Sequence, residues 1–191
     1  MKIEKPKESE IKNMRAEFES FAPGSFDKLF NGKVLLAVRG NWTEIVLANP
    51  ETAERALKMA GAAGDKSVAG APTAPAEESD QKTPYAIGTT IGEIKDGWFR
   101  LGLGGASLLG PIAQSRYAIV NEKAVSLFLY GRDIIGPSVI EFKAKKGNHI
   151  LVLNEKRECL GLGKLVEEPK NTSHTAIKNS RDLGWYIREG Y

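Results

Sequence analysis

The stretch Ala124–Phe142 carries the clearest local signals in the chain, and these signals restrict the fold strongly. Apolar residues recur at helical spacing over Val125–Leu129, and Asn121 precedes them as a candidate N-cap. Gly131 then stands where a helix would end, because glycine enters the left-handed backbone region without a Cβ clash. Val139–Phe142 is typical of a strand. The stretch therefore predicts a helix, a glycine bend, a short strand, a turn at Gly136–Pro137 and a second strand, in that order.

This order of elements resembles the start of a PUA domain, the small RNA-binding pseudo-barrel found on pseudouridine synthases and archaeosine transglycosylases. Three tracts narrow the resemblance to the archaeal type of the Nip-seven family of large-ribosomal-subunit biogenesis factors: Phe128–Gly131, Leu160–Gly163 and Asp182–Arg188. Trp98–Leu101 stands before the PUA-like segment, as a similar tract does in that family. The order and spacing of these tracts support the resemblance more than any single tract does.

The resemblance implies a non-catalytic factor that binds RNA during biogenesis of the large ribosomal subunit and processing of pre-rRNA. The implied RNA-binding surface combines the glycine bend, a late strand and the C-terminal segment: Tyr130, Gly131, Arg132, Lys164, Lys178, Arg181 and Arg188, flanked by Lys145 and Lys146. An arginine side chain can donate two hydrogen bonds to one phosphate and can stack on a base. Arg132 and Arg188 are therefore the first candidates for contacts with RNA. Each of these cations is equally compatible with an ordinary solvated surface charge.

The patterns predict an α+β fold with two domains, residues 1–114 and 115–191. The first is expected to hold an antiparallel sheet with helices, and the second a PUA-type β pseudo-barrel. Helices are expected over 9–21, 50–61 and 107–112, and strands over 33–39, 43–48, 85–94 and 98–103. In the second domain, strands are expected to begin near 117, 139, 149 and 159, and Ser180 is expected to cap a last helical turn.

Residues 62–82 interrupt the pattern of the first domain. They are rich in Ala, Gly, Pro, Ser and acidic residues, and Val68 is their only sizeable apolar residue. Such a composition cannot bury enough apolar surface to offset the entropy lost on ordering. We therefore expect a flexible surface insertion, which departs from the shorter connection of the family that the chain resembles.

Two glycine-rich tracts invite a phosphate-loop interpretation. Neither 102–105 nor 161–164 has the spacing and the hydroxyl residue of a P-loop, and neither has a convincing Rossmann context. For the first tract, backbone flexibility at the end of a strand is the favoured use. For the second, the glycines are expected to thin a barrel strand.

Charge is distributed unevenly between the two expected domains. Residues 1–114 carry 14 Lys or Arg and 15 Asp or Glu, whereas residues 115–191 carry 13 and 9, a net charge of +4. A polyanion such as RNA would be drawn to the second domain, although a solvated surface explains the excess equally well. No apolar run is long enough to span a membrane and the N-terminus is charged, so a cytoplasmic protein without a membrane partner is expected.

No arrangement of residues typical of catalysis or metal binding is found in the sequence. The single cysteine, Cys159, lies in a strand-like run and is expected to be a buried thiol, and His149 and His174 have no local partners. Glu167 and Glu168 are adjacent, which points them to opposite faces of an extended chain. We therefore expect no catalytic residue, no metal, no cofactor and no enzymatic activity.

Expected partners are RNA and proteins. Pre-rRNA is the expected RNA, with uridine-rich sequences as candidates, and ribosome assembly proteins are expected to bind the N-terminal domain, where Trp42 is predicted to be exposed. A monomer is expected. Two alternatives stay open: an RNA-modifying enzyme or accessory subunit that holds its substrate through the PUA domain, and a protein–protein adaptor without RNA contact.

Overall fold

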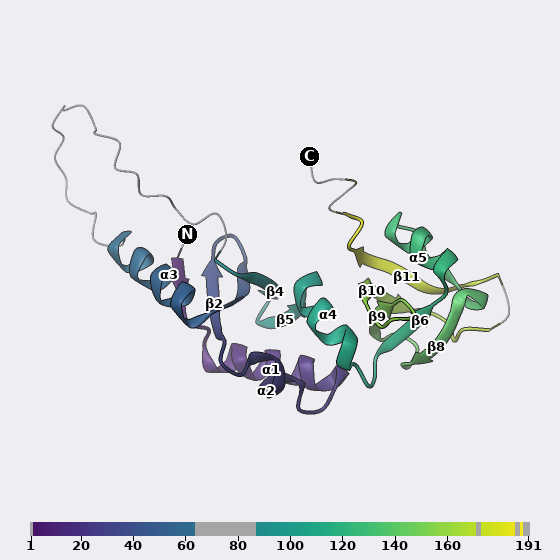
Figure 1. The fold of residues 1–191 in the computed structure, drawn as a ribbon, viewed down its shortest axis with the longest axis horizontal. Coiled ribbons are helices and arrows are strands. Elements are labelled where there is room, and N and C mark those ends of the chain that lie inside the picture. Colours follow the sequence, from purple (N-terminus) through teal and green to yellow (C-terminus); the bar gives the residue numbers. More distant parts are fainter. Residues whose placement is uncertain (1, 64–86, 171–172, 186–187, 189–191) are drawn as a thin grey trace.

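The computed structural model describes residues 2–63, 87–170, 173–185 and 188. Two lobes lie side by side along the long axis of the molecule, with the N-terminal lobe built around one sheet and the C-terminal lobe around another (Figure 1). This α+β arrangement confirms the predicted fold class. None of the helices in the described residues is both long and apolar enough to cross a membrane.

Sheet A forms the N-terminal lobe and is antiparallel throughout, with its strands in sequential order among the described residues. Its strands are β1 (Lys2–Glu4), β2 (Val34–Arg39), β3 (Thr43–Ala48), β4 (Thr89–Lys95) and β5 (Trp98–Leu101). Hairpins connect β2 to β3 and β4 to β5, as the turn residues predict. The first strand was not predicted, since three residues are too few to show an alternating pattern.

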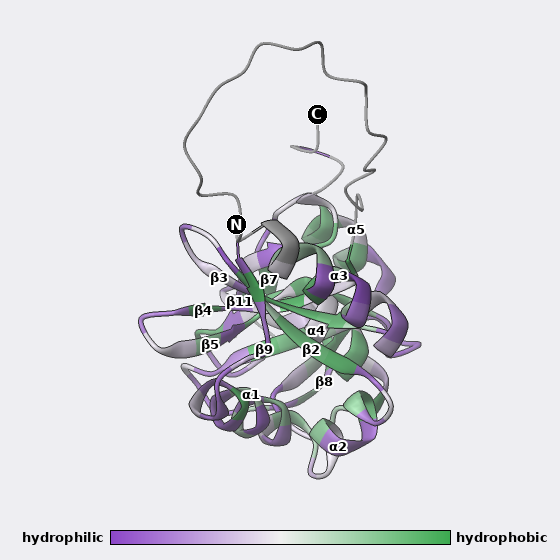
Figure 2. Cartoon of the chain, turned by 90° about the vertical axis from the view of Figure 1, so that its left-hand side faces the viewer, coloured by the Kyte–Doolittle hydropathy of each residue, from purple (hydrophilic) through white to green (hydrophobic). Residues whose placement is uncertain are grey.

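Helices cover part of each face of sheet A. The helices of this lobe are α1 (Glu8–Phe21), α2 (Ser25–Phe30), α3 (Pro50–Ala63) and α4 (Leu103–Leu109), followed by the 3-10 turn η1 (Gly110–Ile112). Helix α1 buries Met14, Phe18 and Phe21 against one face, where the Phe18 and Phe30 rings meet edge to face at 4.9 Å. Helix α3 covers the other face, and hydrophilic residues colour the outer sides of both helices (Figure 2).

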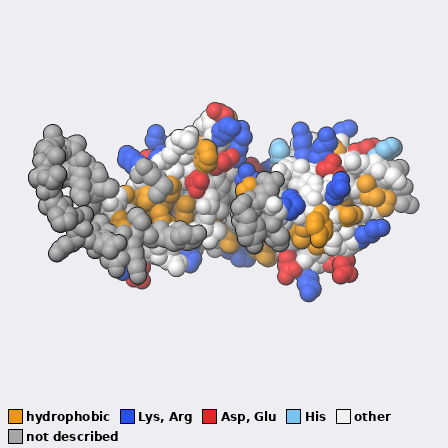
Figure 3. Space-filling view, turned by 90° about the horizontal axis from the view of Figure 1, so that it is seen from above, with side chains coloured by type: hydrophobic (Ala, Val, Ile, Leu, Met, Phe, Trp, Pro, Cys, Tyr) orange, Lys and Arg blue, Asp and Glu red, His pale blue; other side chains and the backbone are white. Residues whose placement is uncertain are grey.

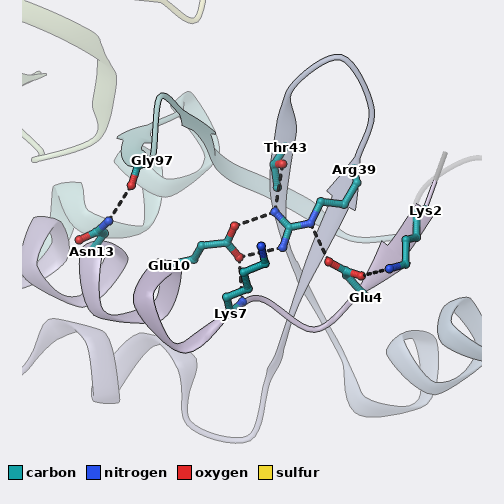
Figure 4. Close-up of polar contacts among 8 residues, drawn as sticks. All are labelled: Lys2, Glu4, Lys7, Glu10, Asn13, Arg39, Thr43 and Gly97. Carbon is teal, nitrogen blue, oxygen red and sulfur yellow. Dashed lines mark hydrogen bonds and ion pairs between the residues drawn. The ribbon is translucent and has the colours of Figure 1, made fainter.

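A partly buried ion-pair network fastens β1, α1 and β2 together (Figure 4). The guanidinium of Arg39 donates two hydrogen bonds to the Glu10 carboxylate, at 2.6 and 2.9 Å, and one to Glu4 at 2.8 Å. Glu10 also accepts from the backbone N–H of Lys7 at 2.8 Å, which caps the start of α1. These bonds hold the pKa of Glu10 below its ordinary value, against the opposing effect of burial.

The glycines of α4 serve packing and not backbone flexibility. A Cβ on Gly104 would lie 2.4 Å from the Thr90 carbonyl oxygen, and one on Gly105 would lie 2.4 Å from the Ile91 oxygen. Helix α4 therefore lies directly on the backbone of β4. The expectation of a flexible strand end at residues 102–105 was wrong. These residues lead into α4, and only glycine, which lacks a Cβ, lets this helix lie so close to the backbone of β4.

Sheet B forms the C-terminal lobe in the strand order β7-β11-β10-β9-β6-β8. Its strands are β6 (Tyr117–Val120), β7 (Ile134–Ile135), β8 (Val139–Lys143), β9 (His149–Leu153), β10 (Cys159–Leu165) and β11 (Thr175–Asp182). All neighbours pair antiparallel except β6 and β9, which are parallel. The sheet curls around a core that α5 (Glu122–Leu129) closes, and the 3-10 turn η2 (Gly136–Ser138) leads into β8.

The predicted glycine bend is confirmed after α5. The Asn121 side chain caps the helix by accepting a hydrogen bond from the Ala124 N–H at 3.0 Å. Gly131 follows with φ of +81°, the left-handed conformation that ends helices.

Several predicted boundaries were wrong, and one lies outside the described residues. The strand expected over 98–103 ends at Leu101, and the helix expected over 107–112 already begins at Leu103. Ser180 does not cap a helix; it lies inside β11, whose many polar residues concealed the strand. Helix α3 continues two residues beyond Gly61, where glycine is tolerated. Of the insertion predicted over 62–82, residues 64–82 lie outside the described part, and Ala62 and Ala63 belong to α3.

The two lobes share a hydrophobic core. The cluster that begins with Met14 and Phe18 under sheet A continues through Leu109 into β6 and β9 of sheet B, where Ile119 and Leu153 belong to it. Arg116 reinforces the junction, since its guanidinium lies 4.4 Å from the centre of the Phe21 ring. The division into two domains at residue 114 thus stays a prediction, and the core runs across it.

Candidate nucleic-acid interface

A row of basic side chains crosses three strands of sheet B. Lys164 on β10 pairs directly with His149 on β9 and with Lys178 on β11. Residues directly opposite each other on neighbouring strands project from the same face of a sheet. All three are exposed, while the flanking Ile150, Leu165 and Ile177 point into the core. We call Lys164, Lys178 and His149 the cationic row.

Like charges placed directly opposite each other are destabilising unless a counter-charge relieves them. Within the described part of the chain, the side chains of Lys164 and Lys178 make no ion pair. The turn that carries Lys145 and Lys146 leads directly into β9, and Gly147 in this turn hydrogen-bonds to the Leu165 carbonyl at 2.7 Å. Lys and Arg side chains gather along one edge of the C-terminal lobe (Figure 3). This edge offers several unneutralised cations to an anion.

The glycine bend forms a second group of predicted residues at the end of α5. Tyr130 is 73% exposed there, and Arg132 is exposed beside it. Arg132 makes no side-chain ion pair within the described residues, so its guanidinium is available for a phosphate. Sequence reasoning placed these residues together, and the structure does the same.

Arg188 lies next to the bend and is engaged in holding the C-terminal segment. Its guanidinium bonds to both carboxylate oxygens of Asp182, at 3.0 and 3.1 Å, and donates to the Leu129 carbonyl. The Asp182 side chain is only 4% exposed, so Arg188 neutralises a buried charge. A Cβ on Gly131 would lie 3.3 Å from Arg188 Nη2. Gly131 thus leaves room for this arginine, and the close approach of an RNA backbone there stays a prediction.

Arg181 lies on β11 at the centre of a hollow region between the lobes. Three neighbouring cavities share it, with volumes of about 320, 480 and 610 Å³. The second cavity reaches Gly131, and the third reaches His149 at the end of the cationic row. Arg181 makes no ion pair within the described residues and is exposed. Arg181 therefore lines both the cavity that reaches the glycine bend and the cavity that reaches the cationic row.

Sequence reasoning missed the contribution of sheet A to this region. The first cavity is lined on one side by Trp42, Glu44, Glu93 and Arg100, which we call the open face of sheet A. Glu93 pairs directly with Glu44 and with Arg100, so the three side chains share one face. The side chains along 98–101 alternate between exposed and more buried positions, and a two-residue period of this kind indicates a strand with one outward face. Only the fold, however, could bring that face close to Arg181.

The remaining chemically reactive groups lie apart from this region. Cys159 is buried, as predicted, and burial raises the pKa of its thiol to about 12, which keeps the sulfur protonated. Tyr117 donates a hydrogen bond to Glu141, which raises the pKa of its hydroxyl. Within the described residues, no group of three or more His, Cys, Asp and Glu side chains could hold a metal ion.

Comparison of the sequence with protein families matches the C-terminal lobe. Residues 116–191 match the family model of the UPF0113 PUA domain. A UPF0113 protein of Aeropyrum pernix is 30% identical over 108 residues, a stretch that covers 56% of this chain and 59% of that relative. The C-terminal lobe is therefore similar in sequence to the UPF0113 PUA domain, and the chain spans 59% of that relative's length.

Comparison with solved structures agrees on the fold of the whole chain. A hypothetical protein of Pyrococcus horikoshii superimposes with a TM-score of 0.59 at 14% identity, covering 97% of this chain and 98% of the other. A conserved PUA domain protein of Thermoplasma acidophilum gives 0.59 at 12% identity, covering 95% and 94%. At such identities the likeness establishes the fold alone.

Proposed function

We propose that the chain is a non-catalytic RNA-binding factor that holds RNA on its PUA lobe. The cationic row is the observation that carries this proposal. Two lysines directly opposite each other, without an acidic partner in the described residues, form a site that an anion stabilises. The regular spacing of such cations along a sheet suits the repeated phosphates of a nucleic acid better than a single small anion.

The predicted site residues take different parts in this proposal. Contacts with phosphates that do not depend on the RNA sequence come from four lysines: Lys145, Lys146, Lys164 and Lys178. Arg132 and Arg181 add contacts in which one guanidinium donates two hydrogen bonds to a phosphate. Tyr130, which is 73% exposed, offers a ring on which a base can stack. Arg188 supports the surface chiefly by fixing the C-terminal segment against α5.

The motifs that resemble the Nip-seven family support a finer proposal. In it, the RNA is pre-rRNA, and the factor acts during assembly of the large ribosomal subunit in the cytoplasm. Assembly proteins would then bind the N-terminal lobe, where the Trp98 side chain is 70% exposed. Cross-linking in cells followed by sequencing of the bound RNA tests this finer proposal. Enrichment of large-subunit precursor RNA is expected, and an absence of rRNA among the cross-linked species would contradict it.

RNA binding itself is tested by the salt dependence of affinity. Each phosphate contact with single-stranded RNA contributes about 0.7 to the slope of log affinity against log salt concentration. The double variant Lys164→Ala/Lys178→Ala is expected to lower the slope by about 1.4 and to weaken binding at low salt. Fluorescence anisotropy with a labelled oligomer of about ten nucleotides, between about 50 and 200 mM salt, measures both effects.

A matched pair of lysines provides the control. Lys12 and Lys28 lie exposed on α1 and α2 of the N-terminal lobe and do not belong to the cationic row. Lys12→Ala/Lys28→Ala removes the same charge and is expected to leave the salt slope unchanged. Wild-type affinity that ignores salt, or equal losses in the two double variants, would refute the proposal.

A further inference from the structure

His149 lies at one end of the cationic row, beside the two lysines. It pairs directly with Lys164 on β10, and Lys164 pairs in turn with Lys178 on β11. The three side chains are exposed and project from one face of sheet B. A lysine side chain ordinarily keeps its charge at neutral pH, whereas a histidine gains or loses a proton between about pH 5 and 8. His149 is therefore the member of the row whose charge can change.

The charged groups near His149 are mostly basic. Arg116 donates a hydrogen bond from Nε to the His149 carbonyl oxygen at 3.0 Å, and the Glu17 carboxylate of α1 lies 3.2 Å from the same guanidinium. The His149 side chain itself makes no ion pair or hydrogen bond among the described residues. Three further charged residues line the cavity of about 610 Å³ that His149 also lines: Glu93, Arg100 and Arg181. An anion that approaches this end of the row thus meets more cations than carboxylates.

A phosphate bound at Lys164 would also come within reach of His149. Directly opposite side chains on antiparallel strands have Cβ atoms about 4.5–5.5 Å apart, so both can contact one phosphate or two successive ones. An opposite charge within about 4–6 Å favours the charged form of a titratable group. The protonated imidazole can then donate a charge-assisted hydrogen bond to a phosphate oxygen. RNA at this place would therefore favour the charged form of His149.

We propose that His149 contacts an RNA phosphate together with Lys164 and takes up a proton when the RNA binds. The complex holds this proton more tightly than the protein without RNA does, so the affinity for RNA rises as the pH falls from about 8 to about 5.5. The inference rests on the proposed RNA-binding function and deepens it, because it adds a contact residue and makes binding depend on pH. Sequence reasoning assigned His149 no role in RNA binding.

Binding of oligo(U) of about ten nucleotides at two pH values tests the inference, since uracil has no group that titrates in this range. At one fixed low salt concentration, the full chain is expected to bind about fivefold or more tightly at about pH 5.5 than at about pH 8. His149→Gln, which keeps a polar side chain that does not titrate, is expected to bring this ratio close to one. His149→Lys carries a fixed charge and is expected to bind about fivefold or more tightly than wild type at about pH 8.

His174 provides the matched control, because the chain has 2 histidines and this one is exposed outside the cationic row. His174→Gln is expected to keep the wild-type ratio between the two pH values.

Two further measurements separate a phosphate contact from a merely structural role of His149. The slope of log affinity against log salt concentration is expected to be steeper by about 0.7 at the lower pH for wild type, because one more phosphate is neutralised, but not for His149→Gln. Calorimetric titration at about pH 7, in two buffers with different heats of protonation, is expected to show net uptake of about half a proton. The uptake should disappear in His149→Gln.

The outcomes separate this inference from the function on which it rests. Equal wild-type affinity at the two pH values, or a pH dependence that survives His149→Gln, would overturn the role assigned to His149. If oligo(U) binding still depends on salt and on Lys164 and Lys178 in that case, the proposed function stands. Absence of salt-dependent binding at both pH values would refute the proposed function and the inference together.

Discussion

Single charged residues in this chain have different roles that exposure alone does not reveal. Arg39, Arg116 and Arg188 each bind carboxylates or carbonyls that fasten two elements together. Arg132 and Arg181 make no ion pair within the described residues. Sequence reasoning treated Arg132 and Arg188 as equivalent candidates, because a pattern of residues shows that a cation is present but not which anion the fold supplies.

At this scale, Glu10 provides a prediction about stability and pH. Because Arg39 and the helix cap lower its pKa, the stabilising contribution of Glu10 is present above its ordinary pKa of about 4.3 and is lost as the pH falls through the lowered value. Glu10→Gln is expected to lower the free energy of unfolding by about 1.5–3 kcal/mol at neutral pH. The difference from wild type should shrink in acid.

Urea unfolding measured at several pH values checks this expectation. Glu8→Gln is the control, since Glu8 lies exposed in the same first turn and acts mainly through the helix dipole, with an expected loss below about 1 kcal/mol. Equal losses for Glu8→Gln and Glu10→Gln, or a loss that does not change with pH, would contradict the assigned role of the Arg39 pair.

At the scale of elements, most of the architecture could be predicted because strong periodicity marked it. The helix after Asn121, its end at Gly131 and the strands beginning near 117, 139, 149 and 159 were predicted correctly. The missed elements are short or polar: β1 has three residues, and β11 carries four charged or amide side chains. Such strands form because they pair with neighbouring strands, and the local pattern of apolar and polar residues gives no sign of this pairing.

Helix α4 provides a prediction at this scale through its glycines. Gly104→Ala would place a methyl group against a backbone oxygen that cannot move aside easily, and is expected to cost about 1–3 kcal/mol of stability. Gly61→Ala in α3 is the matched control, since nothing lies within 4 Å of its added Cβ, and it is expected to stabilise the chain by about 0.5–1 kcal/mol. Thermal denaturation followed by circular dichroism measures both, and equal signs for the two variants would contradict the packing role of α4.

At the scale of the whole molecule, the candidate site depends on an arrangement that the sequence could not disclose. The cationic row was partly predictable, since its lysines lie in a basic, strand-rich segment. The first cavity at Arg181 could not be predicted, because residues of β3, β4, β5, α4 and β11 line it and only the packed lobes bring these elements together. The excess of positive charge lies in the second lobe, so counting charges did not indicate that residues of the first lobe also line the candidate site.

The continuous core predicts that the two lobes unfold together. Val152 lies in the C-terminal core alone, and its side chain is fully buried. In a Trp185→Phe background, fluorescence reports only Trp42 and Trp98 of the N-terminal lobe. Val152→Ala, at a cost of about 2 kcal/mol, is expected to lower the N-terminal melting temperature by about 4–8 °C. Two separate transitions, with the tryptophan signal unmoved, would contradict a single cooperative unit.

The contacts of Arg116 at the lobe junction have a mechanical consequence. Its guanidinium bonds to Glu17 and Ser20 of α1, while its carbonyl accepts from Leu151 of β9. Such cross-bracing leaves little freedom for hinge bending. If RNA binds as proposed and spans both lobes, it must therefore adapt its own path to a rigid junction. The flexibility of the RNA itself would then affect how tightly it binds.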